Sequence, residues 1–187
     1  MVNKSEERGL KELISAAQHY RGMARTFRSS VGVAFQMWDG KVFGGFNIET
    51  YGHKGLHAEE VGIVRALAEG YNGTDFRRMV EIFQDAGHSE VEIFPACFTC
   101  WAAMWEWTHP YLEVIVADTE GNSKYSVRLK EMFSQAPPAQ IYPSNKIREI
   151  KPKINFMPKL PLHSELKEFA KKDPEFEKYC KILRVQI

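Results

Sequence analysis

The sequence has few cysteines, no long apolar run and no internal repeat. Its three cysteines, Cys97, Cys100 and Cys180, are too few for a disulfide framework and are typical of a reducing compartment. A membrane helix needs about 18 consecutive apolar residues, and no such run occurs, nor does the first segment resemble a secretion signal. We therefore expect a cytoplasmic protein.

Charge is balanced over the whole chain but not along it. The formal net charge is +1, yet residues 143–187 contain eleven Lys and Arg against six Asp and Glu. Residues 1–142 contain fourteen basic against eighteen acidic residues. This mildly acidic main part argues against a protein that holds nucleic acid, because phosphates require a basic surface.

The length of 187 residues favours one domain with an appendage, since domains average about 150 residues. We predict a main domain over residues 1–142 and a Pro- and Lys-rich C-terminal extension over residues 143–187. Within the extension, residues 143–161 are expected to be extended, and residues 163–180 to form two short helices that break near Asp173.

The strongest chemical signal lies in two short motifs, His57 to Glu60 and Cys97 to Cys100. Zinc takes imidazole nitrogen and thiolate sulfur in tetrahedral sites, and a catalytic zinc keeps three protein ligands and one water. The pattern therefore predicts a zinc ion held by His57, Cys97 and Cys100. Two thiolates and a neutral imidazole also balance the two charges of the metal.

Glu59 lies close to these ligands without being needed as one. Bound zinc lowers the pKa of a coordinated water from about 15.7 to about 7, so that a nucleophile forms at neutral pH. The carboxylate of Glu59 is suited to take a proton from this water and to pass it on.

The two cysteines also allow other interpretations. A C-x-x-C pair at a strand-to-helix turn suits a thioredoxin-like redox protein, but that function leaves His57 and Glu59 without a role. A structural zinc ribbon requires a second pair of cysteines, which Cys180 alone does not supply.

Together these residues resemble the zinc-dependent cytidine deaminase family, whose signature is H-x-E followed by P-C-x-x-C. The resemblance covers about residues 29–134 and implies a three-layer α/β/α fold around a mixed five-stranded sheet. It is carried further by four segments that follow the family's order: Val31-Gly32-Val33-Ala34, Asp39-Gly40, Gly45 to Glu49, and Val114 to Asp118 with Gly121.

The sequence departs from the family pattern in several places. Ala96 separates the proline from the first cysteine, and Trp101-Ala102 replaces an Arg-Gln pair. Ser29 stands where the family has phenylalanine, and residues 49–57 form a shorter segment with different spacing. We therefore expect the substrate contacts to differ from those of the family.

The resemblance implies a hydrolase that deaminates cytidine or deoxycytidine to uridine or deoxyuridine and ammonia in pyrimidine salvage. Glu59 would move protons, the backbone near Ala58 would contact the pyrimidine, and Asn47 and Glu49 would bind the ribose. Without the resemblance, turn chemistry is the preferred role of Asn47 and Glu49. The family also implies a homotetramer, or a homodimer.

Two alternatives stay open. The same chemistry suits another substrate, namely a modified cytidine, a nucleotide, a blasticidin-like aminopyrimidine or cytosine within a polynucleotide. The second alternative is a non-catalytic scaffold that zinc only stabilises, although a structural zinc has no use for the base that Glu59 supplies.

Hydrophobic periodicity and turn residues predict most of the secondary structure. We interpret residues 72–88 as an insertion whose default role is surface packing, with a lid or an oligomer contact as the alternatives. Trp101, Trp105 and Trp107 are expected in the core or a subunit interface. The expected helices are 5–20 with Ser5 as N-cap, 58–70, 76–85, 98–107 and 129–134, and the expected strands are 30–37, 41–47, 90–94, 112–117 and a short one near Tyr125.

Overall fold

A computed structural model of the chain describes residues 4–51, 55–85, 96–134 and 163–182. The chain divides into two compact units, Met1–Leu129 and Lys130–Ile187. The predicted domain boundary after residue 142 lies outside the described residues. The expected strand at 90–94 and the expected extended segment at 143–161 lie outside them as well.

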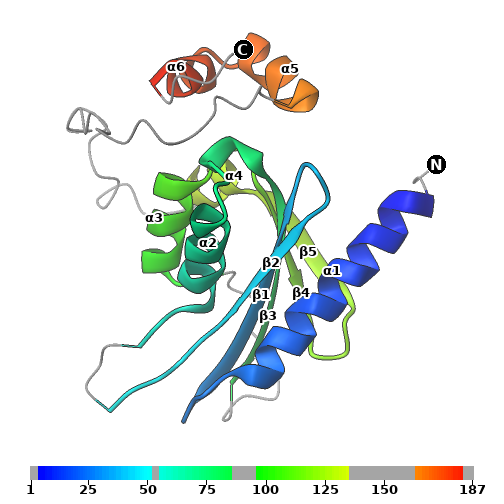
Figure 1. Ribbon diagram of the computed structural model, residues 1–187, viewed down its shortest axis with the longest axis vertical. Coiled ribbons are helices and arrows are strands. Elements are labelled where there is room, and N and C mark those ends of the chain that lie inside the picture. Colours follow the sequence, from blue (N-terminus) through cyan, green and yellow to red (C-terminus); the bar gives the residue numbers. More distant parts are fainter. Residues whose placement is uncertain (1–3, 52–54, 86–95, 135–162, 183–187) are drawn as a thin grey trace. The chain divides into compact units, whose positions relative to one another are not determined.

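A mixed five-stranded sheet forms the centre of the first unit, with the strand order β2-β1-β3-β4-β5 (Figure 1). Neighbouring strands are antiparallel, except that β3 and β4 run parallel. This arrangement confirms the predicted mixed sheet. The strands are β1 (Ser29–Met37), β2 (Val42–Phe46), β3 (Phe76–Asp85), β4 (Glu113–Ala117) and β5 (Ser123–Arg128).

Helices cover both faces of the sheet, which confirms the predicted three layers (Figure 1). Helix α1 (Lys4–Met23) lies on one face, and α2 (Ala58–Ala68) and α3 (Phe98–Trp107) lie on the other. A short 3-10 helix, η1 (Gly73–Asp75), precedes β3, and α4 (Leu129–Ser134) follows β5. Among the described residues, no helix is both long enough and apolar enough to span a bilayer.

The helix α1 packs on the sheet through the apolar positions that the helical spacing predicts. These positions are buried together with side chains of β1, β3 and β4. Ser5 is not the N-cap, because the helix already includes Lys4. The buried cluster consists of Leu13, Ile14, Ala17, Ala34, Val80, Ile82, Ile115 and Ala117.

A hairpin around Asp39-Gly40 joins β1 and β2, which correspond to the strands predicted at 30–37 and 41–47. The backbone N–H of Met37 donates to the carbonyl oxygen of Lys41 at 2.8 Å, and Gly40 has a φ of +90°. Glycine adopts this left-handed conformation without the steric cost of a Cβ. The hairpin delivers the chain to the segment that precedes α2.

Residues 76–85 form the central strand β3, so the prediction of a short helix in an inserted surface segment is wrong. The strand pairs with β1 on one side and with β4 on the other. Met79, Val80 and Ile82 are fully buried, and Arg78 and Glu81 are almost so. A strand covered on both faces lacks the apolar–polar alternation that identifies strands in a sequence. The strand that runs parallel to β4 is β3.

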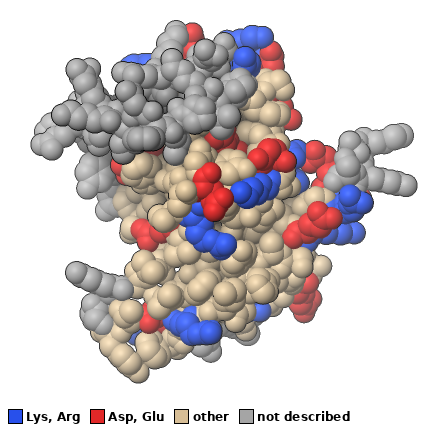
Figure 2. All heavy atoms as spheres, in the orientation of Figure 1, with Lys and Arg blue, Asp and Glu red and all other residues tan. Residues whose placement is uncertain are grey.

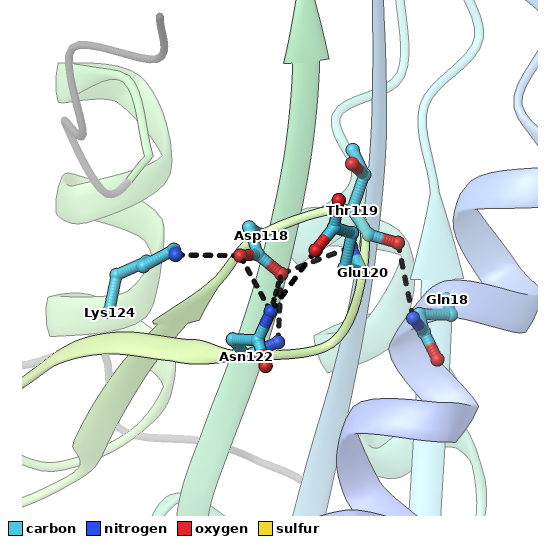
Figure 3. Close-up of polar contacts among 6 residues, drawn as sticks. All are labelled: Gln18, Asp118, Thr119, Glu120, Asn122 and Lys124. Carbon is cyan, nitrogen blue, oxygen red and sulfur yellow. Dashed lines mark hydrogen bonds and ion pairs between the residues drawn. The ribbon is translucent and has the colours of Figure 1, made fainter.

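The turn between β4 and β5 is held by Asp118 and is tied to α1 (Figure 3). The Oδ1 atom of Asp118 accepts a hydrogen bond from the backbone N–H of Asn122 at 2.8 Å. Lys124 Nζ lies 2.7 Å from Oδ2. Gln18 of α1 donates to the carbonyl oxygen of Thr119 at 3.2 Å, so the turn is fixed to the helix that covers the sheet.

The second unit contains the two helices predicted for residues 163–180, namely α5 (Ser164–Lys172) and α6 (Pro174–Ile182). Asp173 separates them. Its Oδ1 accepts hydrogen bonds from the backbone N–H groups of Glu175 and Phe176 at 3.1 and 3.2 Å. Asp173 thus caps the start of α6, where two N–H groups have no partner within the helix.

Gly45 of β2 allows α2 to approach the sheet closely. A Cβ at this position would overlap the carbonyl oxygen of Ala58 and would lie 2.7 Å from the backbone nitrogen of Gly62. We expect Gly45→Ala to push α2 outward and to lower the free energy of unfolding by about 3 kcal/mol, as measured by urea denaturation.

Gly22→Ala is the matched control, because a Cβ there meets nothing within 4 Å. Gly22 lies in α1, where alanine is up to about 1 kcal/mol more favourable than glycine. Equal stability of the two alanine variants would contradict the close approach at Gly45.

Candidate metal centre and its cavity

Two helices begin at the candidate metal centre. His57 is the N-cap of α2, with φ −86° and ψ 147°, and Cys97 is the N-cap of α3, with φ −75° and ψ 164°. Cys100 lies in the first turn of α3 and is fully buried. The positive ends of both helix dipoles thus face this centre, where they stabilise thiolates and carboxylates.

The three predicted ligand side chains converge. His57 Nδ1 lies 3.4 Å from Cys97 Sγ and 3.2 Å from Cys100 Sγ, and the two sulfur atoms are 3.5 Å apart. Tetrahedral zinc at ordinary bond lengths separates two thiolates by about 3.8 Å and a thiolate from an imidazole nitrogen by about 3.6 Å. The donor set therefore fits zinc after outward shifts of a few tenths of an ångström.

The pKa values of the two cysteine thiols are shifted in opposite directions. A hydrogen bond from the Cys100 thiol lowers the pKa of Cys97 to about 5, helped by backbone N–H groups and His57 and opposed by burial. The same hydrogen bond, together with burial and the nearby Glu59, raises the pKa of Cys100. One sulfur is thus ready to bind a metal, and the other releases a proton when it does so.

Glu59 is buried beside this donor set, with 3% of its surface exposed. Burial raises the pKa of Glu59, although its own backbone N–H and the Cys100 thiol donate hydrogen bonds to it. A carboxyl group that titrates closer to neutral pH is suited to carry a proton during a reaction.

A cavity of about 780 Å³ opens at the metal centre. His57, Ala58, Glu59 and Cys97 line it, and Ala58 is fully buried. Phe27 and Tyr51 also line the cavity; their ring centroids are 4.5 Å apart, and 59% and 88% of their surfaces are exposed. The cavity therefore joins a buried polar region to an exposed aromatic pair.

Asn47 lines the cavity and holds its wall. Its Oδ1 accepts a hydrogen bond from the backbone N–H of Val31 at 2.8 Å, and its Nδ2 donates to the carbonyl oxygen of Ser29 at 2.7 Å. These contacts correspond to the local role that the sequence allows for Asn47.

Glu49 holds the adjoining part of the same wall. Its carboxylate accepts hydrogen bonds from the backbone N–H groups of Phe27, Arg28 and Ser29 at 2.6, 2.9 and 3.1 Å. The ribose contact predicted for Asn47 and Glu49 stays a prediction. Both residues do lie on the cavity surface.

Glu81 is a cavity residue that the sequence motifs do not identify, because the helix predicted for residues 76–85 would place it on the surface. Glu81 lies on β3, lines the cavity and is 3% exposed. Burial and the charge of Glu59 raise the pKa of Glu81 well above its usual range, although the backbone N–H of Ala96 donates to it. The signal in the sequence was one carboxylate within the apolar run from Met79 to Phe83.

The three tryptophans of α3 separate into two groups. Trp101 is 9% exposed and belongs to the core. Trp105 and Trp107 are 41% and 51% exposed. The expected core position is thus confirmed for Trp101, and an interface position stays a prediction for the other two.

Solved structures of cytidine deaminases match the chain over two thirds of its length. The Burkholderia pseudomallei enzyme matches with 28% identity and a TM-score of 0.57, over 67% of this chain and 97% of the other. In fold, the chain is similar to cytidine deaminases, which supports a cytidine deaminase-like family. The motif-based resemblance is thereby confirmed. No family model and no curated protein matches the chain.

More distant matches show the same cytidine deaminase-like fold. The Mycobacterium leprae enzyme is 21% identical, with a TM-score of 0.51 over 66% of this chain and 96% of its own. The Bacillus anthracis enzyme is 14% identical, with a TM-score of 0.52 over 68% and 88%. At these identities the likeness concerns the fold alone.

In this cytidine deaminase-like chain, the cavity wall depends on the ionised carboxylate of Glu49. We expect Glu49→Gln to lower the free energy of unfolding at pH 7 by about 1–3 kcal/mol, because an NH₂ group replaces one accepting oxygen. Burial raises the pKa of Glu49, but its three backbone hydrogen bonds lower it by more. The net result is a pKa below the ordinary value. Its contribution is therefore present above the unfolded pKa and lost as the pH falls through the folded one.

Urea unfolding at pH 7 and at about pH 3 tests this prediction, since the difference from the natural protein should shrink at the lower pH. Glu12→Gln is the control, because the Glu12 side chain is 71% exposed and pairs with Arg8 on the surface of α1. We expect it to change stability by no more than about 0.5 kcal/mol. A pH-independent effect of Glu49→Gln would contradict the role of the charge.

Proposed function

We propose that the protein is a zinc-dependent hydrolytic deaminase of an aminopyrimidine, with cytidine or deoxycytidine as the substrate that the resemblance implies. The observation that supports this most is the convergence of His57, Cys97, Cys100 and Glu59 at one cavity. Its volume of about 780 Å³ lies within the usual range of small-molecule sites, about 300–1,000 Å³.

His57, Cys97 and Cys100 would hold the zinc ion, since their donor atoms are all within 4.8 Å of one another. The chemistry that zinc supplies in such a site is Lewis-acid activation of a water molecule. The helix starts at His57 and Cys97 fix two of these donors on the backbone.

Glu59 would move the protons of the reaction. It takes a proton from the attacking water and delivers it to the ring nitrogen beside the reacting carbon. The second proton of that water then goes to the exocyclic amine, which leaves as ammonia while a carbonyl oxygen replaces it. The balance is one aminopyrimidine and one water consumed, with one pyrimidinone and one ammonia formed.

The outer cavity offers groups for a sugar. Asn47 uses one N–H of its amide for the backbone, which leaves a second N–H, and the Glu49 oxygens keep further lone pairs. These groups support ribose binding by Asn47 and Glu49. The exposed Phe27 and Tyr51 rings provide apolar surface beside them.

A free small molecule is favoured over a polynucleotide. On the described part of the face shown in Figure 2, Lys and Arg residues are interspersed with Asp and Glu. A polynucleotide site needs a positively charged groove that follows the backbone. The scaffold alternative is disfavoured because Glu59 is buried beside the donor atoms, where a structural zinc needs no carboxyl group.

We also propose a cytoplasmic homo-oligomer, tetrameric or dimeric, that serves pyrimidine salvage. Thiolate ligands require a reducing compartment, and the three cysteines of the chain form no disulfide. The exposed Trp105 and Trp107 of α3 are residue types that are common in subunit interfaces.

Removal of a ligand should release the metal. We expect His57→Ala and Cys97→Ala to lose most of the zinc that the natural protein retains after gel filtration, about one ion per chain. Elemental analysis of the purified protein measures this. Cys180→Ala is the matched control, because Cys180 lies in α6 of the second unit and should leave the zinc content unchanged. Stoichiometric zinc in either ligand variant would refute that ligand.

Replacement of Glu59 should separate zinc binding from turnover. We expect Glu59→Gln to keep its zinc and to release ammonia about 10²–10⁴-fold more slowly, because the proton carrier is lost. Glu69→Gln, at the exposed end of α2, is the control.

The substrates for this assay are cytidine, deoxycytidine, their monophosphates, cytosine and single-stranded oligonucleotides. Turnover of a free nucleoside that depends on Glu59 supports the proposal. Ammonia release from oligonucleotides alone, or full activity of Glu59→Gln, would contradict it.

A further inference from the structure

The cavity contains a second buried carboxyl group, Glu81, that belongs to none of the sequence motifs. Its Oε1 accepts a hydrogen bond from the backbone N–H of Ala96 at 3.2 Å. Its Oε2 is buried and has no hydrogen-bond partner among the described residues. Leaving a buried polar oxygen without a partner costs free energy, so such groups in natural proteins usually have a role.

Glu81 is held rigidly in place. It lies in the middle of the central strand, opposite Val33 of β1 and Val116 of β4. The backbone of Glu81 therefore cannot move away from the cavity wall without disrupting pairing on both sides of β3. The position of a carboxyl group on a rigid strand suits the recognition of one fixed ligand group.

The residue that fixes the orientation of Glu81 is also unusual. Ala96 has a φ of +55°, a left-handed conformation that costs a residue with a Cβ about 1–2 kcal/mol. It is the residue inserted between the proline and Cys97, where the family signature has none. The inserted residue thus links Glu81 directly to the segment that carries the candidate metal ligands.

The chemistry of the cavity wall points to the ligand. Glu59 and Glu81 both line it, and the charge of Glu59 raises the pKa of Glu81. The reacting edge of cytosine carries one amino group, and Glu59 alone can serve that group. A second carboxyl group at the same end of the cavity calls for a second N–H donor on the ligand.

We propose that Glu81 is a specificity-determining residue whose Oε2 accepts a hydrogen bond from a second amino group of the substrate. The preferred substrates are then amino-heterocycles with two amino groups, of the 2,4-diaminopyrimidine or 2,6-diaminopurine type. This inference rests on the proposed function, because it assigns the substrate class of the same cavity. Hydrolysis exchanges one amino group for a carbonyl oxygen and releases ammonia, while the second amino group stays on Glu81.

Matched ligand pairs test the inference on the full-length, zinc-loaded protein. The pairs are 2,4-diaminopyrimidine against cytosine and 2,6-diaminopurine against adenine, which differ at the second amino position. Binding is measured by isothermal titration calorimetry, and ammonia release is measured in parallel. We expect the natural protein to bind the diamino member of a pair about 10- to 100-fold more tightly, as for one hydrogen bond to a charged or strongly polar group.

Glu81→Gln is the informative variant, because its amide oxygen can still accept from Ala96 while its NH₂ group cannot accept from a ligand. We expect it to lose the preference within each pair and to bind the monoamino member unchanged. Glu113→Gln on the neighbouring strand β4 is the control, because the Glu113 carboxylate bonds to Ser126 and does not line the cavity. The control should keep the full preference.

The outcomes separate this inference from the proposed function. Equal binding of both members by the natural protein, or a preference that survives in Glu81→Gln, overturns the role of Glu81, whether or not cytidine is deaminated. A preference that Glu81→Gln abolishes, without ammonia release from these compounds or from cytidine and deoxycytidine, supports Glu81 and overturns the deaminase function. Failure of the natural protein to bind any of the four compounds overturns the role of Glu81, whereas the deaminase function is decided by the assay with cytidine and deoxycytidine.

Discussion

The close contact of α2 with the sheet is the constraint on which the rest of the site depends. Glycine at position 45 allows the first turn of α2 to lie against β2, where any side chain would overlap the carbonyl oxygen of Ala58. His57 and Glu59 are attached to this turn. Because α3 begins over the same face of the sheet, its two cysteines reach His57 Nδ1 at 3.2–3.4 Å. Donors separated by some forty positions in the sequence thereby become one group.

Three glutamates line one cavity and differ in their surroundings. Glu49 accepts three backbone hydrogen bonds, which outweigh partial burial and keep its pKa below the usual value. Glu59 and Glu81 are almost completely buried, and burial raises the pKa of both. One carboxylate is therefore ionised at neutral pH and holds the wall. The other two retain protons more readily and are suited to proton movement or ligand recognition.

The sequence predicts the candidate metal site better than it predicts the sheet. His57, Cys97 and Cys100 could be identified because zinc ligands have few residue types and short spacings. The β1–β2 hairpin and α3 could also be identified, since their signals are local. The strand β3 could not, because its burial on both faces removes the alternation of apolar and polar residues. Glu81 was missed for the same reason, since its role depends on which strand carries it.

The parallel pairing of β3 with β4 has a consequence for the order of folding. The hairpins β1–β2 and β4–β5 join neighbouring segments and close short loops, whereas β3 must join both hairpins across longer stretches of chain. Loop-closure entropy makes such long-range pairing the slower step. His57 precedes β3 and the two cysteines follow it, so the three donors meet only after this strand is in place. A metal ion that needs all three donors would thus bind late in folding, after the chain has reached its native topology.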